Sequence, residues 1–205
     1  MVEQFSCGSF FTNCYVISND KRECIVIDPG LSFNRVYNQI ISKYKVLAVF
    51  LTHGHVDHID GIGYFNNIPI YIGEYDKPLL FDNRLSLYEA FGLRRNYNLS
   101  DIDVHTLKDR DIINISDFTI KAISTPGHTK GSMSYEINKE LFSGDTLFNM
   151  SIGRCDFPTG NTSEMNSSLK KIISLYPNDI KLYPGHGDET TLSFEKKYNS
   201  FLANL

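Results

Sequence analysis

The chain lacks any apolar run long enough to cross a membrane. A spanning helix needs roughly 20 consecutive apolar residues, and no stretch of the 205 residues approaches that length. The first residues also lack the basic segment and following apolar block of a secretory signal, because Glu3 comes early and no lysine or arginine precedes it. We therefore expect no membrane partner and a cytoplasmic location.

Clustered positive charge is missing too. The formal net charge is −4, and the lysines and arginines are scattered apart from short pairs. A surface that follows nucleic-acid phosphates needs a basic patch, so we expect no nucleic-acid partner. A small-molecule substrate is expected instead, and a homo-oligomer is an open alternative.

Cysteines and linkers are equally scarce. The four cysteines, Cys7, Cys14, Cys24 and Cys155, have neither CxxC spacing nor the density of a disulfide scaffold, so we expect thiols. Three of them are expected to pack as small hydrophobic side chains. No stretch rich in proline, glycine or serine divides the chain, and its length suits one domain spanning residues 1–205, without a separate C-terminal helical domain.

Short apolar runs are what the sequence has in number. Val46–Leu51 is a continuous apolar run that stops at Thr-His-Gly-His, which is typical of a strand buried on both faces that ends in a loop. Further strands are expected in the following segments: Tyr15–Ile17, Cys24–Ile27, Ile68–Ile72, Phe118–Ile123, Met133–Ile137 and Ile180–Tyr183.

Helical periodicity appears between these runs. It predicts helices over 33–44, with Val36, Ile40 and Ile41 on one face, and over 163–176, with Met165, Leu169, Ile172 and Ile173 on one face. The last segment places Phe194, Tyr198, Phe201 and Leu205 at helical spacing, which predicts a helix that closes over a core with these residues. We also interpret residues 74–104 as a helical excursion. Strands interrupted by helices indicate an α/β (α+β) protein whose sheets are covered by helices.

A cluster of histidines follows the Val46–Leu51 run. Three of the six histidines lie in one H-x-H-x-D-H pattern that begins at His53. Neutral imidazole and carboxylate are ligands for zinc and other first-row divalent ions. Gly54 breaks the strand and lets the backbone wrap around an ion. We therefore expect His53 and His55 to meet on one metal.

The second half of the H-x-H-x-D-H pattern is expected to face away from His53 and His55. Asp57 and His58 are expected to begin a short helix that runs to about Phe65, so their side chains diverge from the first pair. They can address a second metal close by. A surface loop seldom carries three imidazoles and a carboxylate directly after a buried strand, because such neighbours repel or need partners.

Two further histidines repeat one local design. His128 and His186 each follow an apolar strand and a Pro-Gly pair, which makes a tight turn and directs the next side chain off the sheet edge. Asp145 lies at the end of another apolar run, where two metals would need an anionic bridge. His105 lacks this setting, and we interpret it as a surface residue.

In this order the residues resemble the metallo-β-lactamase superfamily, and most closely glyoxalase II (hydroxyacylglutathione hydrolase) and its shorter bacterial relatives. Four motifs carry the resemblance: Thr52-His53-Gly54-His55, Thr125-Pro126-Gly127-His128-Thr129-x-Gly131-Ser132, Ser143-Gly144-Asp145-Thr146-Leu147-Phe148 and Gly153-Arg154-Cys155-Asp156-Phe157-Pro158. The resemblance implies a four-layer αββα sandwich with two divalent ions at one edge of the sheets. It places His53, His55 and His128 on one ion, Asp57, His58 and His186 on the other, and Asp145 between them.

The resemblance also implies a reaction. Two divalent ions, zinc by expectation with iron or manganese as alternatives, can lower the pKa of a shared water so that hydroxide attacks a thioester carbonyl. Asp57 and His58 are the expected catalytic residues, and Asp57 would also orient the hydroxide. Arg154 stands where glyoxalase II commonly has a lysine that contacts the substrate's carboxylate, so we expect it to bind substrate. Cys155 beside it is not expected to be a nucleophile.

Three alternatives stay open. A persulfide dioxygenase would hold a single iron through a similar ligand set, His53, His55 or His128 and Asp145, and such enzymes share a Gly-Arg-x-Asp-Phe segment that resembles 153–157. A lactonase or β-lactamase would use the same hydroxide, although zinc β-lactamases often carry a cysteine or another residue in place of Asp145. A protein that binds metal without turnover is the third alternative.

Overall fold

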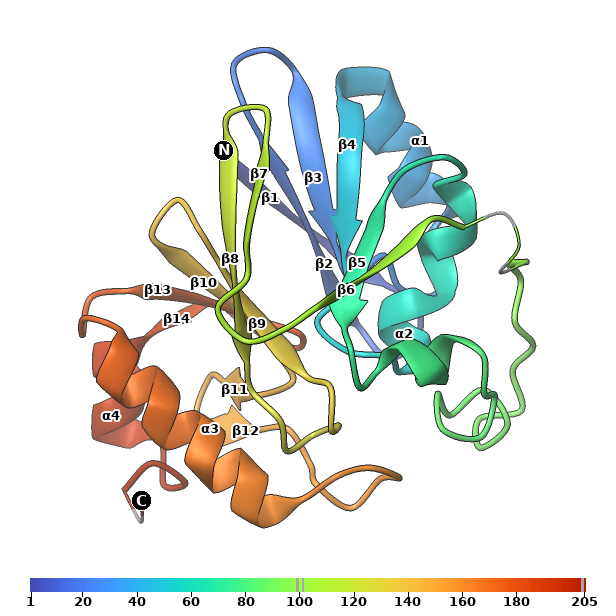
Figure 1. The fold of residues 1–205 in the computed structure, drawn as a ribbon. Coiled ribbons are helices and arrows are strands. Elements are labelled where there is room, and N and C mark those ends of the chain that lie inside the picture. The colour runs from blue at the N-terminus through green and yellow to red at the C-terminus, as the bar shows by residue number, and fades with distance from the viewer. Residues whose placement is uncertain (99, 101, 204) are drawn as a thin grey trace. The chain divides into compact units, whose positions relative to one another are not determined.

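The computed structural model describes residues 1–98, 100, 102–203 and 205. The chain forms two compact units, Met1–Leu107 and Lys108–Leu205, each built on a six-stranded sheet (Figure 1). Within the described residues, no helix is both long and apolar enough to span a bilayer. All four cysteines are thiols, and Cys7, Cys14 and Cys24 are buried as predicted, while Cys155 is half-buried.

The first unit contains a mixed sheet in which the strands follow the order of the chain. Strand β2 pairs antiparallel with both of its neighbours, β1 and β3. From β3 to β6, each strand runs parallel to the next. Their bounds are β1 Val2–Cys7, β2 Thr12–Ser18, β3 Glu23–Ile27, β4 Lys45–Phe50, β5 Ile70–Gly73 and β6 Val104–Leu107. The predicted Val46–Leu51 strand is β4, and Ala48 to Leu51 are fully buried because both faces of this strand are covered.

The helices of the first unit agree with the sequence in part. Helix α1 spans Asn34–Lys43 beside β4, but Ile40 is its only buried residue and Ile41 is 49 % exposed, so the predicted face is narrower than expected. After the histidine cluster, α2 (Val56–Ile59) continues into the 3₁₀ helix η1 (Asp60–Tyr64), which confirms the predicted short helix.

The helical prediction for 74–104 is wrong. The described residues there form the 3₁₀ turn η2, Lys77–Leu80, followed by turns, and they contain no α-helix, while residues 99 and 101 lie outside the description. Aromatic anchors replace helical packing in this segment, since Tyr88 is fully buried and Tyr97 nearly so. Tyr88 donates a hydrogen bond of 2.8 Å to Asp60 of η1.

The second unit holds a sheet in the order β14-β13-β10-β9-β8-β7. Its pairs are antiparallel except for β10 and β13, which run parallel. The bounds are β7 Ile112–Ile115, β8 Phe118–Ser124, β9 Met133–Ile137, β10 Glu140–Gly144, β13 Lys181–Pro184 and β14 Thr190–Thr191, with a separate hairpin of β11 Leu147–Phe148 and β12 Ser151–Ile152.

Helices α3 and α4 cover one face of this sheet (Figure 1). Helix α3 spans Thr162–Leu175. The Asn161 side chain caps its N-terminus by accepting hydrogen bonds from the backbone N–H groups of Ser163 and Glu164. Its predicted apolar face is confirmed, because Met165, Leu169 and Ile172 are fully buried against β10 and β13.

The face predicted for the last helix is wrong, although the helix exists as α4, Leu192–Tyr198. The aromatic stripe is exposed, with Phe194 at 38 % and Tyr198 at 49 % exposure. The buried positions are instead Leu192 and Glu195 on the helix, followed by Asn199 and Leu202. The reason is that a carboxylate, Glu195, occupies the interior side and fixes the rotation of the helix.

Glu195 is fully buried and accepts three hydrogen bonds. They come from the Met150 backbone N–H at 2.9 Å, the Thr190 hydroxyl at 2.6 Å and the Asn199 amide at 2.8 Å. Asn199 also donates to the Ser151 carbonyl at 3.0 Å. A buried charge needs such partners, and here they tie α4 to the β11–β12 hairpin.

We predict that Glu195→Gln destabilises the protein by about 2–3 kcal/mol, because three donors surround the carboxylate and an amide NH₂ would face one of them. Thermal unfolding should show a Tm lower by about 5–10 °C. Glu89→Gln, at an exposed position, is the matched control and should leave the Tm unchanged. An unchanged Tm in Glu195→Gln would contradict this account of α4.

Candidate metal-binding residues

In the first unit, the candidate residues follow the carboxyl ends of two parallel strands. Strand β3 ends at Ile27 and β4 at Phe50, and the two are neighbours in parallel register. Loops at this edge of a parallel sheet meet, which is why ligand sites recur there. Asp28 follows β3 directly, and the segment from Thr52 to His58 follows β4.

The Asp28 carboxylate organises this edge. It is 1 % exposed and accepts from the Thr52 backbone N–H at 2.7 Å and from the Thr52 hydroxyl at 2.6 Å. The His58 Nδ1 atom lies 2.9 Å from the same carboxylate. A carboxylate only accepts hydrogen bonds, so His58 carries its proton on Nδ1 and keeps a lone pair on Nε2.

The same reasoning shows which ring nitrogen of His53 carries the proton. Its Nδ1 atom lies 3.1 Å from the Thr52 hydroxyl. That hydroxyl has given its only proton to Asp28, so it can only accept from His53. His53 therefore also keeps its lone pair on Nε2. Partners of this kind, which set the tautomer and ring orientation, accompany metal-ligating histidines.

The rings of the first unit lie close together. The centroids of His53 and His55 are 4.7 Å apart, and those of His53 and His58 are 4.1 Å apart. All three imidazoles are at least 98 % buried. Asp57 lies beside them, with its Oδ2 atom 3.5 Å from His58 Nε2, and it accepts a 2.9 Å hydrogen bond from the Thr12 hydroxyl of β2.

Gly54 is needed where the sequence places it. A Cβ atom there would lie 2.5 Å from the Cβ of Leu79, closer than two such atoms approach. The Gly54 N–H donates to the buried Asp76 carboxylate at 2.9 Å. Close packing from one side and this hydrogen bond from the other hold the His53–His58 loop in place.

In the second unit, three strands deliver the candidate residues to one edge. Strands β8, β10 and β13 all run in the same direction, so their carboxyl ends share an edge of the sheet. His128 follows β8, Asp145 follows β10 and His186 follows β13. The Gly185 N–H donates to the Gly144 carbonyl at 2.9 Å, which joins two of these turns.

Asp145 lies between the two histidines. Its Oδ2 atom is 3.5 Å from His128 Nε2 and 3.6 Å from His186 Nε2. The His128 Nδ1 atom donates to the Arg154 backbone carbonyl at 2.7 Å, and this again leaves the lone pair on Nε2. The Phe148 ring packs 5.9 Å from the His186 ring, centroid to centroid.

The Pro-Gly turn before His128 packs against helix α3. Gly127 has a φ of +144°, and a Cβ there would lie 2.4 Å from the Met165 Cα. Its carbonyl accepts from the Asn161 N–H at 2.8 Å. Only glycine allows this approach, so the turn predicted from the sequence is also a packing contact.

Arg154 already has a partner. Its guanidinium makes two hydrogen bonds of 2.6 Å to the Asp156 carboxylate and lies 4.1 Å from the centre of the Phe157 ring. The Arg154 side chain lowers the pKa of Asp156 to about 2.

Burial raises the pKa of the neighbouring Cys155 thiol, which supports the prediction that Cys155 is no nucleophile. His105 is half-exposed beside Asp103, as predicted.

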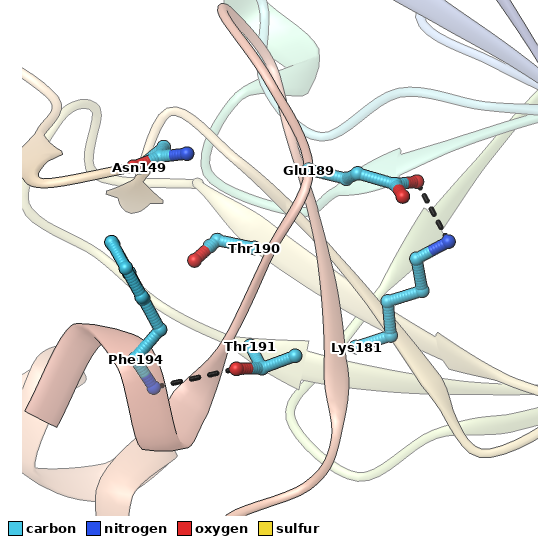
Figure 2. A pocket seen from close by; sticks show the side chains of 6 residues that line it. All are labelled: Asn149, Lys181, Glu189, Thr190, Thr191 and Phe194. Carbon is cyan, nitrogen blue, oxygen red and sulfur yellow. Dashed lines mark hydrogen bonds and ion pairs between the residues drawn. The ribbon is translucent and has the colours of Figure 1, made fainter.

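A cavity of about 300 Å³ in the second unit lies apart from the chemistry-bearing side chains (Figure 2). It is lined by Asn149, Lys181, Glu189, Thr190, Thr191 and Phe194. Two of these residues, Lys181 and Glu189, form a 2.7 Å ion pair, and the hydrogen bond that Lys181 donates to Glu189 raises the pKa of Lys181. None of the predicted ligands lines it, so we assign it no role in the reaction.

Sequence reasoning missed Asp28, Thr52 and Asp76 as supporting residues. The signal for Asp28 was present, since an aspartate directly follows the buried Cys24–Ile27 run, as Asp145 follows its own run. No local pattern marks Asp76, which reaches Gly54 from 22 positions further along the chain. Its role depends on the tertiary structure alone.

The donor chemistry fits divalent metal ions within each unit. Imidazoles with Nε2 lone pairs and adjacent carboxylates are what zinc, iron and manganese take from proteins. Supporting partners hold the imidazoles of His53, His58 and His128 in the required tautomer.

Comparisons with known proteins agree with this chemistry. The chain is 33 % identical, over 92 % of its length and 84 % of the relative, to a probable metallo-hydrolase of Streptococcus pyogenes. It is 30 % identical to the hydroxyacylglutathione hydrolase GloC of Haemophilus influenzae, over 98 % of this chain and 97 % of the relative.

Solved structures are similar over nearly the whole chain. A B3 metallo-β-lactamase named BLEG-1 matches with a TM-score of 0.91 and 33 % identity, covering 98 % of this chain and 99 % of that one. A protein crystallised in a di-iron-bound form matches with a TM-score of 0.84 and 28 % identity, covering 98 % and 100 %. The family model of the metallo-beta-lactamase superfamily matches residues 7–186, which include every predicted ligand. This chain therefore belongs to the metallo-β-lactamase superfamily, with its mixed α/β fold and its divalent-metal chemistry.

Proposed function

We propose that this protein is a dinuclear metallohydrolase that cleaves thioesters of the S-2-hydroxyacylglutathione type. The observation that carries the proposal is the fixed tautomer of His53, His58 and His128, whose Nδ1 protons go to Thr52, Asp28 and the Arg154 carbonyl. The similarity to a hydroxyacylglutathione hydrolase over almost the full length supports the choice of substrate.

The proposed ligand assignment follows the order of the residues. His53, His55 and His128 would hold one ion, Asp57, His58 and His186 the other, and Asp145 would serve both. Support comes from the second unit itself, where the Asp145 carboxylate already lies within 3.6 Å of an Nε2 atom on each side. The similarity to a di-iron protein leaves iron beside zinc as the resident metal.

When bound, two divalent ions supply a hydroxide at neutral pH and polarise the carbonyl under attack. The chain's own residues orient the groups around that reaction. Thr12 donates to one oxygen of Asp57 and so holds this carboxylate in place, and we propose that Asp57 orients the attacking group. A thiolate leaves readily because thiol pKa values lie near ~8.5, so no residue has to act as a strong general acid.

Arg154 would contact the carboxylate end of the substrate. Its guanidinium carbon lies 4.1 Å from the centre of the Phe157 ring and two hydrogen bonds tie the group to Asp156, so the side chain is preorganised. The guanidinium has five N–H donors and uses two of them on Asp156, so further donors can face an anionic group.

Hydrolysis of β-lactams is the second candidate, because a B3 metallo-β-lactamase has a similar structure at 33 % identity. The reaction needs the same attacking group and no additional residue. A chromogenic β-lactam assayed beside S-D-lactoylglutathione separates the two candidates by the ratio of their kcat/KM values.

The first prediction concerns metal content and turnover. Protein purified without added metal should carry two divalent ions per chain by elemental analysis and should hydrolyse S-D-lactoylglutathione. Removal of the metal with a chelator should abolish turnover, and zinc, iron or manganese should restore it. One iron per chain with oxygen uptake on a persulfide would instead establish the dioxygenase alternative.

Asp57→Ala and His58→Ala should each lower kcat/KM by at least ~100-fold, as expected for loss of a residue in a metal site. His105→Ala is the matched control and should retain full activity, because His105 is half-exposed and its ring contacts Asp103 and Tyr71, neither of which is a proposed ligand. Circular dichroism should show that all three variants are folded. Full activity in either ligand variant would argue against a two-metal mechanism.

Asp28→Asn should weaken metal binding by about 10- to 100-fold, since the amide has a single acceptor oxygen and must turn its NH₂ group either toward the Thr52 N–H or toward the Thr52 hydroxyl and His58. Asn tolerates the left-handed backbone found at this position, where φ is 51°, so the fold should remain. Competition with a chromophoric chelator measures the affinity. Asp103→Asn serves as the control, and equal affinities in the two variants would refute the role given to Asp28.

Arg154→Ala should raise the KM for S-D-lactoylglutathione about 10-fold and leave kcat nearly unchanged. The backbone carbonyl that holds His128 is still present in this variant. Arg110→Ala removes an even more exposed arginine and should change neither constant. A lower kcat at constant KM would show that Arg154 does not act through substrate binding.

A further inference from the structure

Helix α2 is too short to hold its own orientation. It has four residues, Val56–Ile59, and two of them are the proposed ligands Asp57 and His58. A helix of one turn has almost no stability by itself, because nucleation costs more than one turn of hydrogen bonds gains. Contacts from elsewhere in the chain must therefore decide where the side chains of Asp57 and His58 point.

The start of α2 is held by segment 82–97, which follows η2. The Val56 N–H donates to the Ser86 carbonyl at 2.8 Å. Ser86 is fully buried, and both its N–H and its hydroxyl donate to the Asp82 carbonyl, at 3.0 Å and 2.6 Å. The carbonyl that holds Val56 is therefore itself fixed by a closed local turn.

The end of α2 is held by the carboxylate of Asp60, the residue after the helix. Its Oδ1 atom accepts from the Tyr88 hydroxyl at 2.8 Å, and its Oδ2 atom accepts from the Asn96 amide at 3.0 Å. A carboxylate tied at both oxygens fixes the rotation of the backbone that carries it as well as its position. Asp60 follows His58 by two residues, so the same rotation directs the His58 ring.

Two features of this contact lower the stability of the fold. Asp60 is 7 % exposed, and the donors Tyr88 and Asn96 are neutral, although a buried charge is costly unless it is paired. Leu87, between the contact residues Ser86 and Tyr88, is buried with a φ of 69°, which is an outlier for a bulky side chain. Strained backbone gathers at functional sites. Stability alone therefore does not account for the contact.

We propose that Tyr88 is a positioning residue that acts through Asp60. Together they hold α2 at the rotation at which its two proposed ligands meet the second metal ion. The inference rests on the proposed ligand assignment and deepens it. Asp28 fixes the ring of His58, whereas the Tyr88–Asp60 pair fixes the helix that carries this ring.

The two proposed metal ions should respond differently to loss of this contact. His53 and His55 precede α2, so the ion assigned to them does not depend on the rotation of the helix. The ion assigned to Asp57 and His58 does. Stepwise loading of metal-free protein with Co²⁺, monitored by visible absorption in competition with a chelator, measures the two affinities separately.

Tyr88→Phe keeps the ring and removes the hydroxyl. This variant should bind the second Co²⁺ ion about 10-fold more weakly and the first within about 2-fold of wild type. Its Tm should fall by about 5 °C, because one oxygen of the buried Asp60 loses its donor. Circular dichroism at the temperature of the titration should show that the variant is folded.

Tyr44→Phe is the matched control. Its hydroxyl also donates to a carboxylate of the first unit, that of Glu3, but Tyr44 precedes β4 whereas the proposed ligands follow this strand. Both Co²⁺ affinities should equal those of wild type.

A double-mutant cycle separates positioning from a general loss of stability. Asp60→Ala should weaken the second ion as much as Tyr88→Phe does, and the double variant should be no weaker than either single variant, because the two residues act as one unit. Asn96→Ala removes the other donor at an exposed position, so it folds even if Tyr88→Phe does not. It should weaken the second ion by about 3-fold.

Equal weakening of both ions in Tyr88→Phe, unchanged affinities, or additive losses in the double variant would overturn the role of Tyr88. A wild-type protein that binds two Co²⁺ ions but hydrolyses no thioester would overturn the proposed substrate alone. The cobalt affinities would still decide the role of Tyr88 in that case.

Discussion

The carboxylate of Asp28 is the constraint on which the histidine cluster depends. It is buried at the end of β3, and it accepts hydrogen bonds from Thr52 and His58 of the loop after β4. Because a carboxylate can only accept, the protons of His58 and, through the Thr52 hydroxyl, of His53 are both fixed. A single acid thus presets two imidazoles before any cation arrives. Preset donors lose little freedom on binding, which favours tight coordination.

The direction of the strands explains how distant residues come to the same edge within each unit. Parallel β3 and β4 bring Asp28 to Thr52, and β8, β10 and β13, which share one direction, bring His128, Asp145 and His186 together. Each side chain follows the last residue of a buried strand. The backbone of the sheet is rigid, so side chains fixed at its edge keep their geometry better than side chains on long loops.

The sequence predicted these features well where a local rule decides them. The β4 run, the short helix after His55 and the two Pro-Gly turns were all readable, because apolar runs, caps and turn residues act over a few positions. The rotation of α4 was not readable, since the buried position is a carboxylate, Glu195, and one of its partners, Met150, lies 45 positions away in the sequence. The helical prediction for residues 74–104 was wrong for a related reason. Scattered aromatic side chains, and not a periodic apolar face, hold that segment.

The acceptor for His128 is a main-chain oxygen, so the orientation of this ring does not depend on the side chain at position 154. The carbonyl of residue 154 is present whatever side chain stands there, so the imidazole keeps its orientation when that side chain varies. The guanidinium at the same position reaches Asp156 and Phe157 instead. Residue 154 therefore supports the imidazole through its backbone and makes separate contacts through its side chain. A substitution at this position would alter the exposed surface beside His128 and keep the oxygen that orients its ring.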